Sequence, residues 1–560
     1  MPKRLAITIA GAVSLGSYEA GVLYEVLDAI HQHNVSPETS EHERIEVDVL
    51  TGASSGSMTA AIVAHKMLYA ANEFRGPYDN PLYNVWVKQI DLAGLMNTVD
   101  DGTPESESAL RSIFSSNMVE RIAAETLTAR YTDGELPAPI THMAAAKSIS
   151  LGMTLTNMNG VDYGYDMHPS GKFVFTRHED QLTRVVSVEG TDNKETWEEI
   201  RDAAVASGAY PLAFRAKEMD RRRSDYPKSN LEPWTDDPSR FTFTDGGVLQ
   251  NEPLGMAKKL VDAIDHHWHN KSRFFMFVSP HGKNSSADSS FREVNADYFH
   301  MMRRLAKVLL GQSEFQDWVA AVEMNKQIAL LDARAAEVAE KLRSGELKSA
   351  SLKRTADGLL KILFTQPRNG SARRVAKIGP ETLSDARLRI EHQYHEEIEM
   401  LGPGTFSAEA FRDTVLAFEK AANLGGRDYM RIYGVAVSEE LLAGAELSAF
   451  LGFFDERYRV HDYDRGRMVA RGVLTDPALS EPGELGPIRY TPTQTNPIDS
   501  TLNGLQLSQL PSEEQQMFRD GIKKRVNELV RDLIGFWSYP ADVVVIDPVM
   551  NAILNHLFRE

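Results

Sequence analysis

The sequence predicts an α/β fold built on a mainly parallel sheet, and three observations favour this fold class. The chain opens as strand, helix, strand, helix, the pattern of parallel strands joined by covering helices. Four more short apolar runs with strand character follow before residue 285. With 560 residues, 42% apolar and 25% charged, the chain is long enough for one large domain with additions or for two to three domains.

The first elements follow from the spacing of apolar side chains. Residues 5–9 are a continuous apolar run and predict a buried strand. Residues 17–31 predict a helix, because their apolar residues recur at helical spacing, and Glu19 lies near its positive N-terminal end. A second strand is predicted at 46–50, and after a sharp glycine turn a helix of small residues continues to residue 70.

The later elements divide the chain into three predicted regions. Strands are expected at 150–155, 172–176, 241–244 and 274–278, which would complete a catalytic domain over residues 1–285. Residues 286–430 are predicted to be a charged helical region, with its clearest pattern at 291–364. Residues 431–560 are predicted to form a C-terminal α/β extension packed on the catalytic domain, with strands at 431–437 and 543–546, an extended stretch at 475–505 and a helix at 513–536.

Composition excludes several classes of chemistry. The chain has no cysteine, so it can have no disulfide, no cysteine nucleophile and no thiolate-bound metal. Its net charge of -18 argues against a general nucleic-acid binder, which needs a broad basic surface. Outside the N-terminus, no run approaches the roughly 18 apolar residues of a membrane-spanning helix. We therefore expect a cytoplasmic protein that binds no nucleic acid, with peripheral contact at the inner face of the membrane as a further option.

The N-terminal segment has two interpretations. Lys3 and Arg4 followed by an apolar run are typical of a secretory signal, although no clean small-x-small cleavage site follows. The same residues fit a first core strand that ends in a glycine-containing turn. The second interpretation predicts that cleavage would remove part of the active site.

The strongest local motif is Gly52-Ala53-Ser54-Ser55-Gly56, between a predicted strand and a predicted helix. In a nucleophile elbow, the serine adopts a strained conformation, and glycines two positions to either side avoid collisions in the tight turn. Ser54 has this spacing, whereas Ser55 and Ser57 do not. Only two strands precede it, fewer than an α/β-hydrolase normally has. A purely structural glycine turn is the alternative.

A serine nucleophile also needs donors for an oxyanion. The segment from Gly11 to Gly16 follows the first strand, which in a right-handed parallel unit lies beside the second. Its backbone N–H groups could therefore face Ser54. An ordinary strand-to-helix turn is equally compatible with this segment.

Two residues are candidates for the base that activates the serine. Asp245 ends an alternating strand and is followed by Gly246 and Gly247, an arrangement that is also common in simple turns. His281 is the competing candidate in chain order.

Four segments, in chain order, together resemble the patatin-like phospholipases. They are the first strand with its glycine loop and Gly21-Val22-Leu23, the elbow Gly52 to Gly56, the block Ala206 to Phe214, and Asp245-Gly246-Gly247 followed by Asn251 and Pro253. The resemblance covers about the first half of the chain. It implies a three-layer α/β/α fold and a Ser–Asp dyad without histidine, with Ser54 as nucleophile and Asp245 as base. It also implies that the loop at Gly11, Ala12 and Val13 is the oxyanion site.

The glycine loop departs from the family pattern. The family usually has three glycines, a small residue, Arg or Lys, and glycine, whereas this chain has Gly11-Ala12-Val13-Ser14-Leu15-Gly16. Backbone donors do not require glycine, so the N–H groups of Ala12 and Val13 can still serve if their dihedral angles permit. The altered loop therefore weakens the assignment of particular oxyanion donors more than it weakens the assignment of Ser54 and Asp245 as the dyad.

A second segment resembles one found in longer bacterial patatin-like proteins. It runs from Gly452 through Arg457 to the stretch His461-Asp462-Tyr463-Asp464-Arg465-Gly466-Arg467. Its alternating charges predict an ion-paired helix docked on the catalytic layer. Its acidic spacing does not fit a calcium loop.

Because the protein is acidic overall, it would have to contact a membrane through a limited basic or apolar patch. Between residues 348 and 377, eight basic side chains surround the apolar stretch 358–364 and only Asp357 is acidic. This segment could lie on an anionic membrane, or it could be the solvated face of a helix that packs through its leucines. The run Arg221-Arg222-Arg223 is a second basic candidate.

The predicted function is that of a serine lipid acyl hydrolase of the phospholipase A or lysophospholipase type. Its substrate would be a phospholipid or another acyl-ester lipid, and the chemistry needs no metal or cofactor. An acyltransferase that uses the same dyad is one alternative. A catalytically weak lipid-binding or scaffold protein on the same fold is another, kept open by the altered glycine loop.

Overall fold

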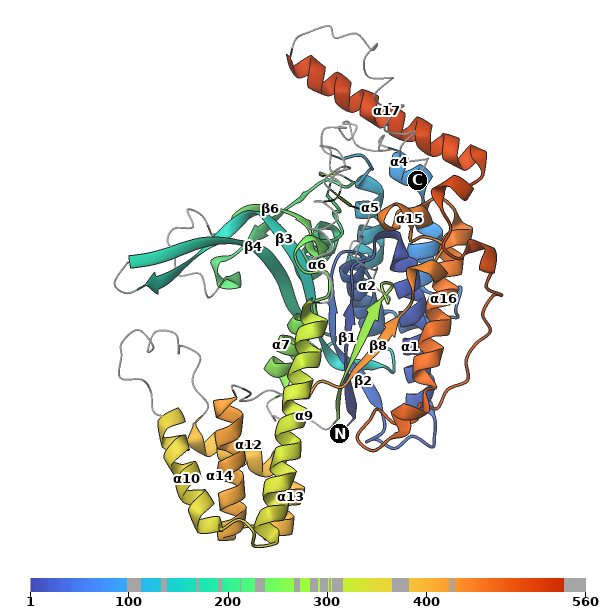
Figure 1. Cartoon of the computed structure of the whole chain (residues 1–560). Helices are drawn as coiled ribbons and strands as arrows, with labels where there is room; N and C mark the ends of the chain where they lie inside the picture. The colour runs from blue at the N-terminus through green and yellow to red at the C-terminus, as the bar shows by residue number, and fades with distance from the viewer. Residues whose placement is uncertain are drawn as a thin grey trace.

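The computed structural model describes residues 2–97, 112–131, 138–167, 171–189, 194–211, 213–226, 237–265, 272–282, 291–292, 301, 304, 316–364, 382–422, 424 and 429–537. The described part of the chain contains one mixed sheet flanked by helices on both faces (Figure 1). The predicted α/β fold with a mainly parallel sheet is confirmed.

The sheet has the strand order β5-β6-β3-β2-β1-β7-β8, and β4 pairs with β3. The five strands from β3 to β8 in that order are parallel, whereas β4 and β6 run antiparallel to β3, and β5 antiparallel to β6. The strands are β1 (Lys3–Ile9), β2 (Ile45–Gly52), β3 (Ala145–Met167), β4 (Gly171–Ser187), β5 (Lys217–Arg221), β6 (Ser239–Asp245), β7 (Arg273–Ser279) and β8 (Ile432–Ala436).

Strand β1 has buried apolar side chains on both of its faces, so helices must cover the sheet on both sides. Its side chains alternate, so Leu5 and Ile7 enter the large core beneath one helical layer, while Ala6 enters a smaller core on the other face. The first layer includes α1 (Gly16–Val35), α2 (Ser55–Tyr69), α6 (Lys194–Ser207) and α16 (Glu456–Leu474). The second consists of α7 (Leu254–Ile264) and the start of α9 (Gln316–Arg343).

Three short helical segments follow α2 in the chain. They are α3 (Pro81–Tyr83), the π-helical turn Asn84–Gln89 and α4 (Leu92–Met96). Helix α5 (Asn117–Leu127) then packs near α2 and α6. The predicted glycine loop becomes a single 3-10 turn, Val13–Leu15, that leads directly into α1.

The edge of the sheet differs most from the sequence prediction. Strands β3 and β4 were expected at 150–155 and 172–176, but they continue far beyond those limits as a hairpin that projects from the sheet (Figure 1). Most described side chains of β4 are exposed, so they lack the apolar alternation by which a strand is recognised. Strand β5 was missed for a related reason, because only Met219 and Arg221 of its five residues are buried.

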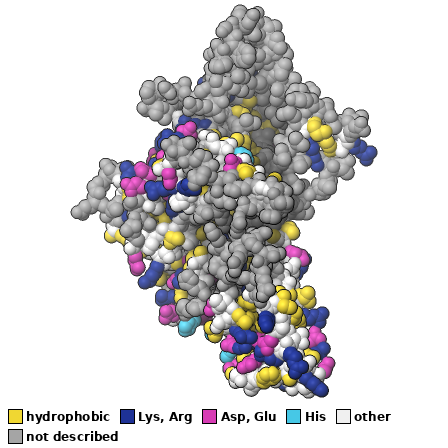
Figure 2. All heavy atoms as spheres, turned by 90° about the vertical axis from the view of Figure 1, so that its left-hand side faces the viewer, with side chains coloured by type: hydrophobic (Ala, Val, Ile, Leu, Met, Phe, Trp, Pro, Cys, Tyr) yellow, Lys and Arg dark blue, Asp and Glu magenta, His cyan; other side chains and the backbone are white. Residues whose placement is uncertain are grey.

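The predicted charged helical region forms a bundle below the sheet in Figure 1. It contains the end of α9 with α10 (Ser349–Leu363), α12 (Leu383–Gln393), α13 (His395–Leu401) and α14 (Phe406–Ala421). Leu360, Ile390 and Phe411 belong to its core. Figure 2 shows basic and acidic side chains interspersed with apolar ones over this bundle, at the bottom of the view.

The C-terminal region extends the sheet and its helical layer. Strand β8 pairs with β7, and α16 lies along α1. The stretch predicted to be extended, 475–505, has no helix or strand beyond 3-10 turns such as Pro477–Ser480 and Ser500–Leu502. It is followed by α17 (Ser512–Trp537), near the predicted 513–536, whereas the predicted strand at 543–546 lies outside the described residues. The division into three regions stays a prediction.

The two basic candidates for membrane contact differ in their surroundings. Arg221 is buried, and its guanidinium lies 3.4 Å from Asp180 Oδ1, so this side chain stabilises the base of the hairpin. In α10, Lys353 forms ion pairs with Asp357 and Asp413, while Leu359 and Ile362 are exposed. Residues 365–377 of the basic segment 348–377 lie outside the described part. No helix within the described ranges is both long and apolar enough to cross a bilayer.

Candidate active site

Ser54 occupies the strained turn between β2 and α2. Its backbone has φ 50° and ψ -126°, a combination that costs on the order of 1–3 kcal/mol for a residue with a side chain. Both flanking glycines are required by close contacts. A Cβ atom on Gly52 would lie 2.2 Å from the carbonyl oxygen of Gly56, and one on Gly56 would lie 2.4 Å from that of Ile9. This is the geometry that the spacing of the motif predicts for a nucleophile elbow.

A chain of serine hydroxyls supports the elbow. The Ser54 N–H donates to Ser207 Oγ at 3.0 Å, and Ser207 Oγ donates to Ser57 Oγ at 2.8 Å. The Ser57 hydroxyl in turn donates to the Gly52 carbonyl oxygen at 2.7 Å. Because Ser207 ends α6, this helix fixes the backbone of Ser54 from the neighbouring layer. Ser207 belongs to the block Ala206 to Phe214 that resembles the family, but its sequence context predicted no role for it.

Asp245 meets Ser54 at the end of strand β6. The Ser54 hydroxyl donates to Asp245 Oδ2 at 2.6 Å, across 191 positions of the chain. The other carboxylate oxygen, Oδ1, accepts the Gly247 N–H at 2.7 Å, and Thr156 Oγ1 donates to the Asp245 carbonyl oxygen at 2.7 Å. A Cβ atom on Gly246 would lie 2.2 Å from the Thr154 carbonyl oxygen, so the turn after the aspartate requires glycine.

The three amides of the glycine loop have different surroundings. The Gly11 N–H donates to the Asn251 carbonyl oxygen at 3.1 Å, and the Ala12 N–H donates to Ser55 Oγ at 2.9 Å. Val13 has φ 50°, and its N–H has no acceptor among the described residues. Of the three predicted donors, Val13 is therefore the one whose amide is available in this structure. Further along the loop, a Cβ on Gly16 would lie 2.5 Å from the Trp86 ring, so glycine lets α1 begin against that side chain.

The residues around this geometry match a known family model, that of patatin-like phospholipases, over positions 7–258. These residues are a patatin-like phospholipase domain. The match begins at Ile7, within β1, includes the glycine loop, the elbow, Ser207 and Asp245, and ends inside α7. The patatin-like domain therefore includes both partners of the 2.6 Å hydrogen bond.

Two curated proteins share more distant similarity with the chain. One is an uncharacterized protein of Sinorhizobium fredii, 26% identical over 324 residues, which are 45% of this chain and 44% of that protein. The other is an uncharacterized membrane protein of Mycobacterium tuberculosis, 23% identical over 435 residues, which are 69% of this chain and 37% of that protein. The matched region spans less than half of the length of each relative.

Burial gives Asp245 the properties of a base that works near neutral pH. The residue is 2% exposed, and desolvation raises the pKa of its carboxyl to about 7. The hydrogen bonds from Ser54 and Gly247 favour the carboxylate and limit that rise. A pKa close to the working pH suits a group that must accept and return a proton.

His281, the competing candidate for the base, has a carboxylate partner outside the patatin-like domain. His281 lies in the loop that follows β7, and its Nδ1 atom lies 2.6 Å from Oε1 of Glu439, which follows β8. The carboxylate of Asp245 occupies the position beside the Ser54 hydroxyl.

Two further residues contribute to the site, although no role in it was predicted for them from the sequence. Asn251 connects both loops of the site, because its carbonyl oxygen accepts the Gly11 N–H and its Oδ1 atom lies where a Cβ on Gly247 would collide. Glu19 lies fully buried in α1, where Ser55 Oγ donates to its Oε2 atom at 3.3 Å. Burial raises the pKa of Glu19 well above its usual range, which favours the uncharged carboxyl over the helix-end charge that its position suggested.

Proposed function

We propose that the protein is a serine lipid acyl hydrolase that cleaves fatty-acyl esters of glycerophospholipids or lysophospholipids through Ser54 and Asp245. The observation that carries the proposal is the 2.6 Å hydrogen bond from the Ser54 hydroxyl to Asp245 Oδ2. It joins a serine in a strained elbow to a buried carboxylate, and both lie within the patatin-like domain. This pairing of a hydroxyl with a base is the arrangement that nucleophilic catalysis requires.

In the proposed reaction, Asp245 takes the Ser54 proton while Ser54 Oγ attacks the ester carbonyl carbon. The resulting tetrahedral intermediate collapses to an acyl-serine, and the protonated Asp245 returns its proton to the departing alcohol oxygen. A water molecule then attacks the acyl-serine, again with Asp245 as proton acceptor. Asp245 then returns this proton to Ser54 Oγ as the bond between the acyl group and the serine breaks, so the cycle consumes one water molecule, releases the alcohol and the fatty acid, and restores both residues.

The negative oxygen of the intermediate would be stabilised by backbone amides of the glycine loop. The Val13 N–H is the first candidate, because the amides of Gly11 and Ala12 already donate within the chain. The Ser55 amide, at the first residue of α2, is a second candidate, since the first N–H groups of a helix lack intrahelical acceptors. Either amide would act together with the positive end of the α2 dipole.

A fluorophosphonate probe tests the nucleophile directly. We expect the intact protein to be labelled on Ser54, as located by mass spectrometry, and we expect Ser54→Ala to abolish both the label and phospholipid hydrolysis. Ser480→Ala is a matched control, because Ser480 is exposed and lies outside the patatin-like domain. An unlabelled Ser54, or full esterase activity in Ser54→Ala, would contradict the proposal.

Product analysis separates hydrolysis from the two alternatives. Free fatty acid as the main product, with or without an added alcohol acceptor, supports hydrolysis. A new ester that appears only with the acceptor would identify an acyltransferase. Lipid binding that Ser54→Ala leaves unchanged, with no acyl-enzyme in the wild type, would identify a binding protein on the same fold.

A further inference from the structure

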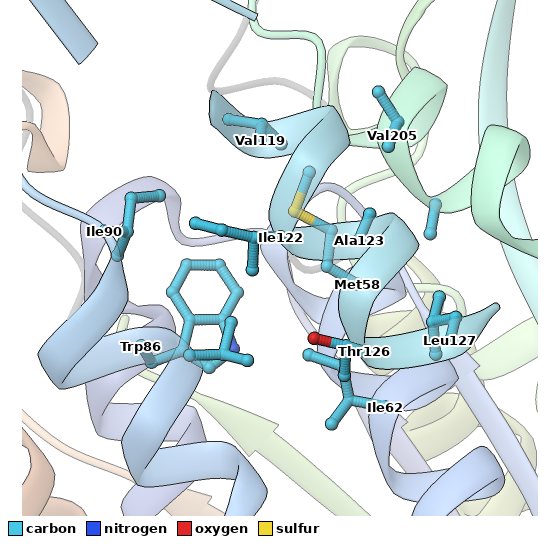
Figure 3. A pocket seen from close by; sticks show the side chains of 12 residues that line it. Met58, Ile62, Trp86, Ile90, Val119, Ile122, Ala123, Thr126, Leu127 and Val205 are labelled. Atoms are coloured by element: carbon cyan, nitrogen blue, oxygen red, sulfur yellow. The ribbon is translucent and has the colours of Figure 1, made fainter. Parts of the chain in front are cut away.

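A small apolar cavity lies within the patatin-like domain, beside the helix that follows Ser54. Its volume is about 40 Å³, and it is enclosed by α2, α5, α6 and the π-helical turn Asn84–Gln89 (Figure 3). Trp86 and Ile90 lie on one side of it in the view, while Met58, Ala123 and Leu127 lie on the other. Thr126 contributes the one hydroxyl among the lining side chains.

The cavity shares its walls with the elements that hold the proposed nucleophile. Met58 lies one helical turn beyond Ser54 in α2, and Val205 lies two positions before Ser207, the last residue of α6. Ser207 is the residue whose hydroxyl accepts the Ser54 N–H. The two helices also touch here, since a Cβ atom on Gly208 would lie 2.3 Å from Met58 Cε. The cavity is therefore lined by the same two helices that hold the elbow.

The π-helical turn gives the cavity a separately anchored wall. Such turns are rare in proteins as a whole, but those that occur are often found at functional sites. Here the Val87 carbonyl oxygen accepts a hydrogen bond from Arg459 Nε at 2.9 Å. Arg459 is buried and belongs to α16, so a residue outside the patatin-like domain fixes the wall that carries Trp86.

We propose that this cavity takes the acyl chain of the ester that is attacked at Ser54, an inference that rests on the proposed function and names the part of the substrate that it recognises. An alkyl chain suits the lining, because each methylene group removed from water strengthens binding about fourfold. The charged head group does not suit it, since a buried charge without a partner is strongly disfavoured. The occupant is therefore an apolar acyl chain and not the charged head group.

The size of the cavity restricts how much of the chain it holds. Its 40 Å³ is about a quarter of the ~150 Å³ of an engineered cavity that binds benzene, so it accepts only a few methylene groups as it stands. Met58 has a flexible side chain that can move aside for a longer chain. Selectivity should consequently depend on the first carbons of the acyl chain, and p-nitrophenyl hexanoate should be a better substrate than p-nitrophenyl acetate.

Filling the cavity from α5 tests the inference. Ala123→Leu and Thr126→Leu each add apolar volume to a half-buried lining position on a helix, where leucine is well tolerated. We expect each variant to lower the ratio of kcat/KM for hexanoate over acetate by about tenfold. Ala124→Leu is the matched control, because it makes the same change one position along α5 at a residue that does not line the cavity. An unchanged ratio in both filling variants would overturn the inference.

A binding measurement separates this inference from the proposed reaction. Hexanoate should bind to the Ser54→Ala protein, and Ala123→Leu in that background should weaken the binding at least fivefold by calorimetry, whereas Ala124→Leu should not. This result would hold even if the wild type hydrolysed no ester, in which case the proposed function alone would fail. Equal hexanoate affinity with and without Ala123→Leu would contradict the acyl-chain site whatever the activity.

Discussion

The backbone N–H of Gly452 donates a hydrogen bond to Ser14 Oγ at 3.1 Å, across 438 positions of the chain. The contact is close, since a Cβ atom on Gly452 would lie 2.5 Å from Ser14 Oγ. Ser14 directly follows Val13, whose amide is our first candidate for oxyanion stabilisation. The C-terminal region thus contacts the patatin-like domain beside its proposed catalytic loop.

Helix α16 holds the segment that makes this contact. The Asp462 carboxylate accepts the N–H groups of Ala443 and Gly444 at 2.7 and 2.9 Å, and Arg459 Nη1 donates to the Gly452 carbonyl oxygen at 3.0 Å. The charge-rich motif of α16 was predicted to dock on the catalytic layer. Its buried side chains do more than form ion pairs, because they also position backbone next to the proposed active site.

We predict that Ser14→Ala lowers kcat about fivefold and lowers the melting temperature. The substitution leaves the Gly452 N–H without its acceptor, which costs on the order of 1–3 kcal/mol for a buried group, and it loosens the loop that carries the Val13 amide. Steady-state kinetics and thermal unfolding check this, with Ser480→Ala as an exposed control. A lower melting temperature with unchanged kcat would show that the contact stabilises the fold without serving catalysis.

The pKa of Asp245 predicts an acid limit for activity. Because only the ionised carboxylate can accept the Ser54 proton, kcat/KM should fall about tenfold for each pH unit below about 7. The measurement is a pH profile with an uncharged ester, so that ionisation of the substrate does not contribute. A profile that stays flat from pH 7 down to pH 5 would mean that the base has an ordinary carboxyl pKa.

The same pKa predicts a gain in stability when the charge is removed. The folded-state pKa of about 7 lies above that of the unfolded chain, so ionisation of Asp245 opposes folding increasingly as the pH rises from about 4 to 7. Asp245→Asn should therefore be inactive and yet melt at a higher temperature than the wild type at pH 8. At pH 4 the two proteins should differ little. A destabilised Asp245→Asn at pH 8 would contradict this account.

Glu19 should be replaceable by an uncharged amide. Its buried carboxyl has a pKa well above the usual range, and the described residues form no ion pair with it. Glu19→Gln keeps an oxygen acceptor for Ser55 Oγ, which in turn accepts the Ala12 N–H. We expect this variant to retain kcat within about threefold, whereas Glu19→Ala should lose at least tenfold. Equal losses in both variants would mean that the ionised carboxylate is required.

Helices α1 and α16 approach each other too closely for any side chain at their contact. A Cβ atom on Gly21 would lie 1.9 Å from the Tyr463 carbonyl oxygen, and one on Gly466 would lie 2.2 Å from that of Tyr18. Gly21→Ala should therefore destabilise the protein by about 2 kcal/mol or more in chemical unfolding.

Gly472→Ala is the matched control for this prediction, because Gly472 also lies in α16 but nothing approaches within 4 Å of its added Cβ atom. It should stabilise the protein by about 0.4–1 kcal/mol. If both alanines had the same effect, helix propensity rather than the close approach would be the cause.

Much of the site could be predicted from local patterns. The glycines around Ser54 and after Asp245 are required by contacts within a few residues or with an adjacent strand, so their spacing carries the information. The supporting residues could not be found in this way. Ser207 and Asn251 act through hydrogen bonds to segments that are distant in the sequence, and the residues next to them in the chain give no sign of these partners.

The sequence by itself determined the layered α/β class, the elbow at Ser54 and the turn at Asp245, because apolar periodicity and glycine spacing are local properties of the chain. Only the tertiary structure decided that β3 and β4 form a long hairpin, that Glu19 is buried beside Ser55, and that Gly452 meets Ser14. The physical reason is that desolvation and long-range hydrogen bonds depend on which surfaces pack together. The charge pattern of α16 predicts a helix, but the role of each of its side chains depends on the residues that pack against it in the folded protein.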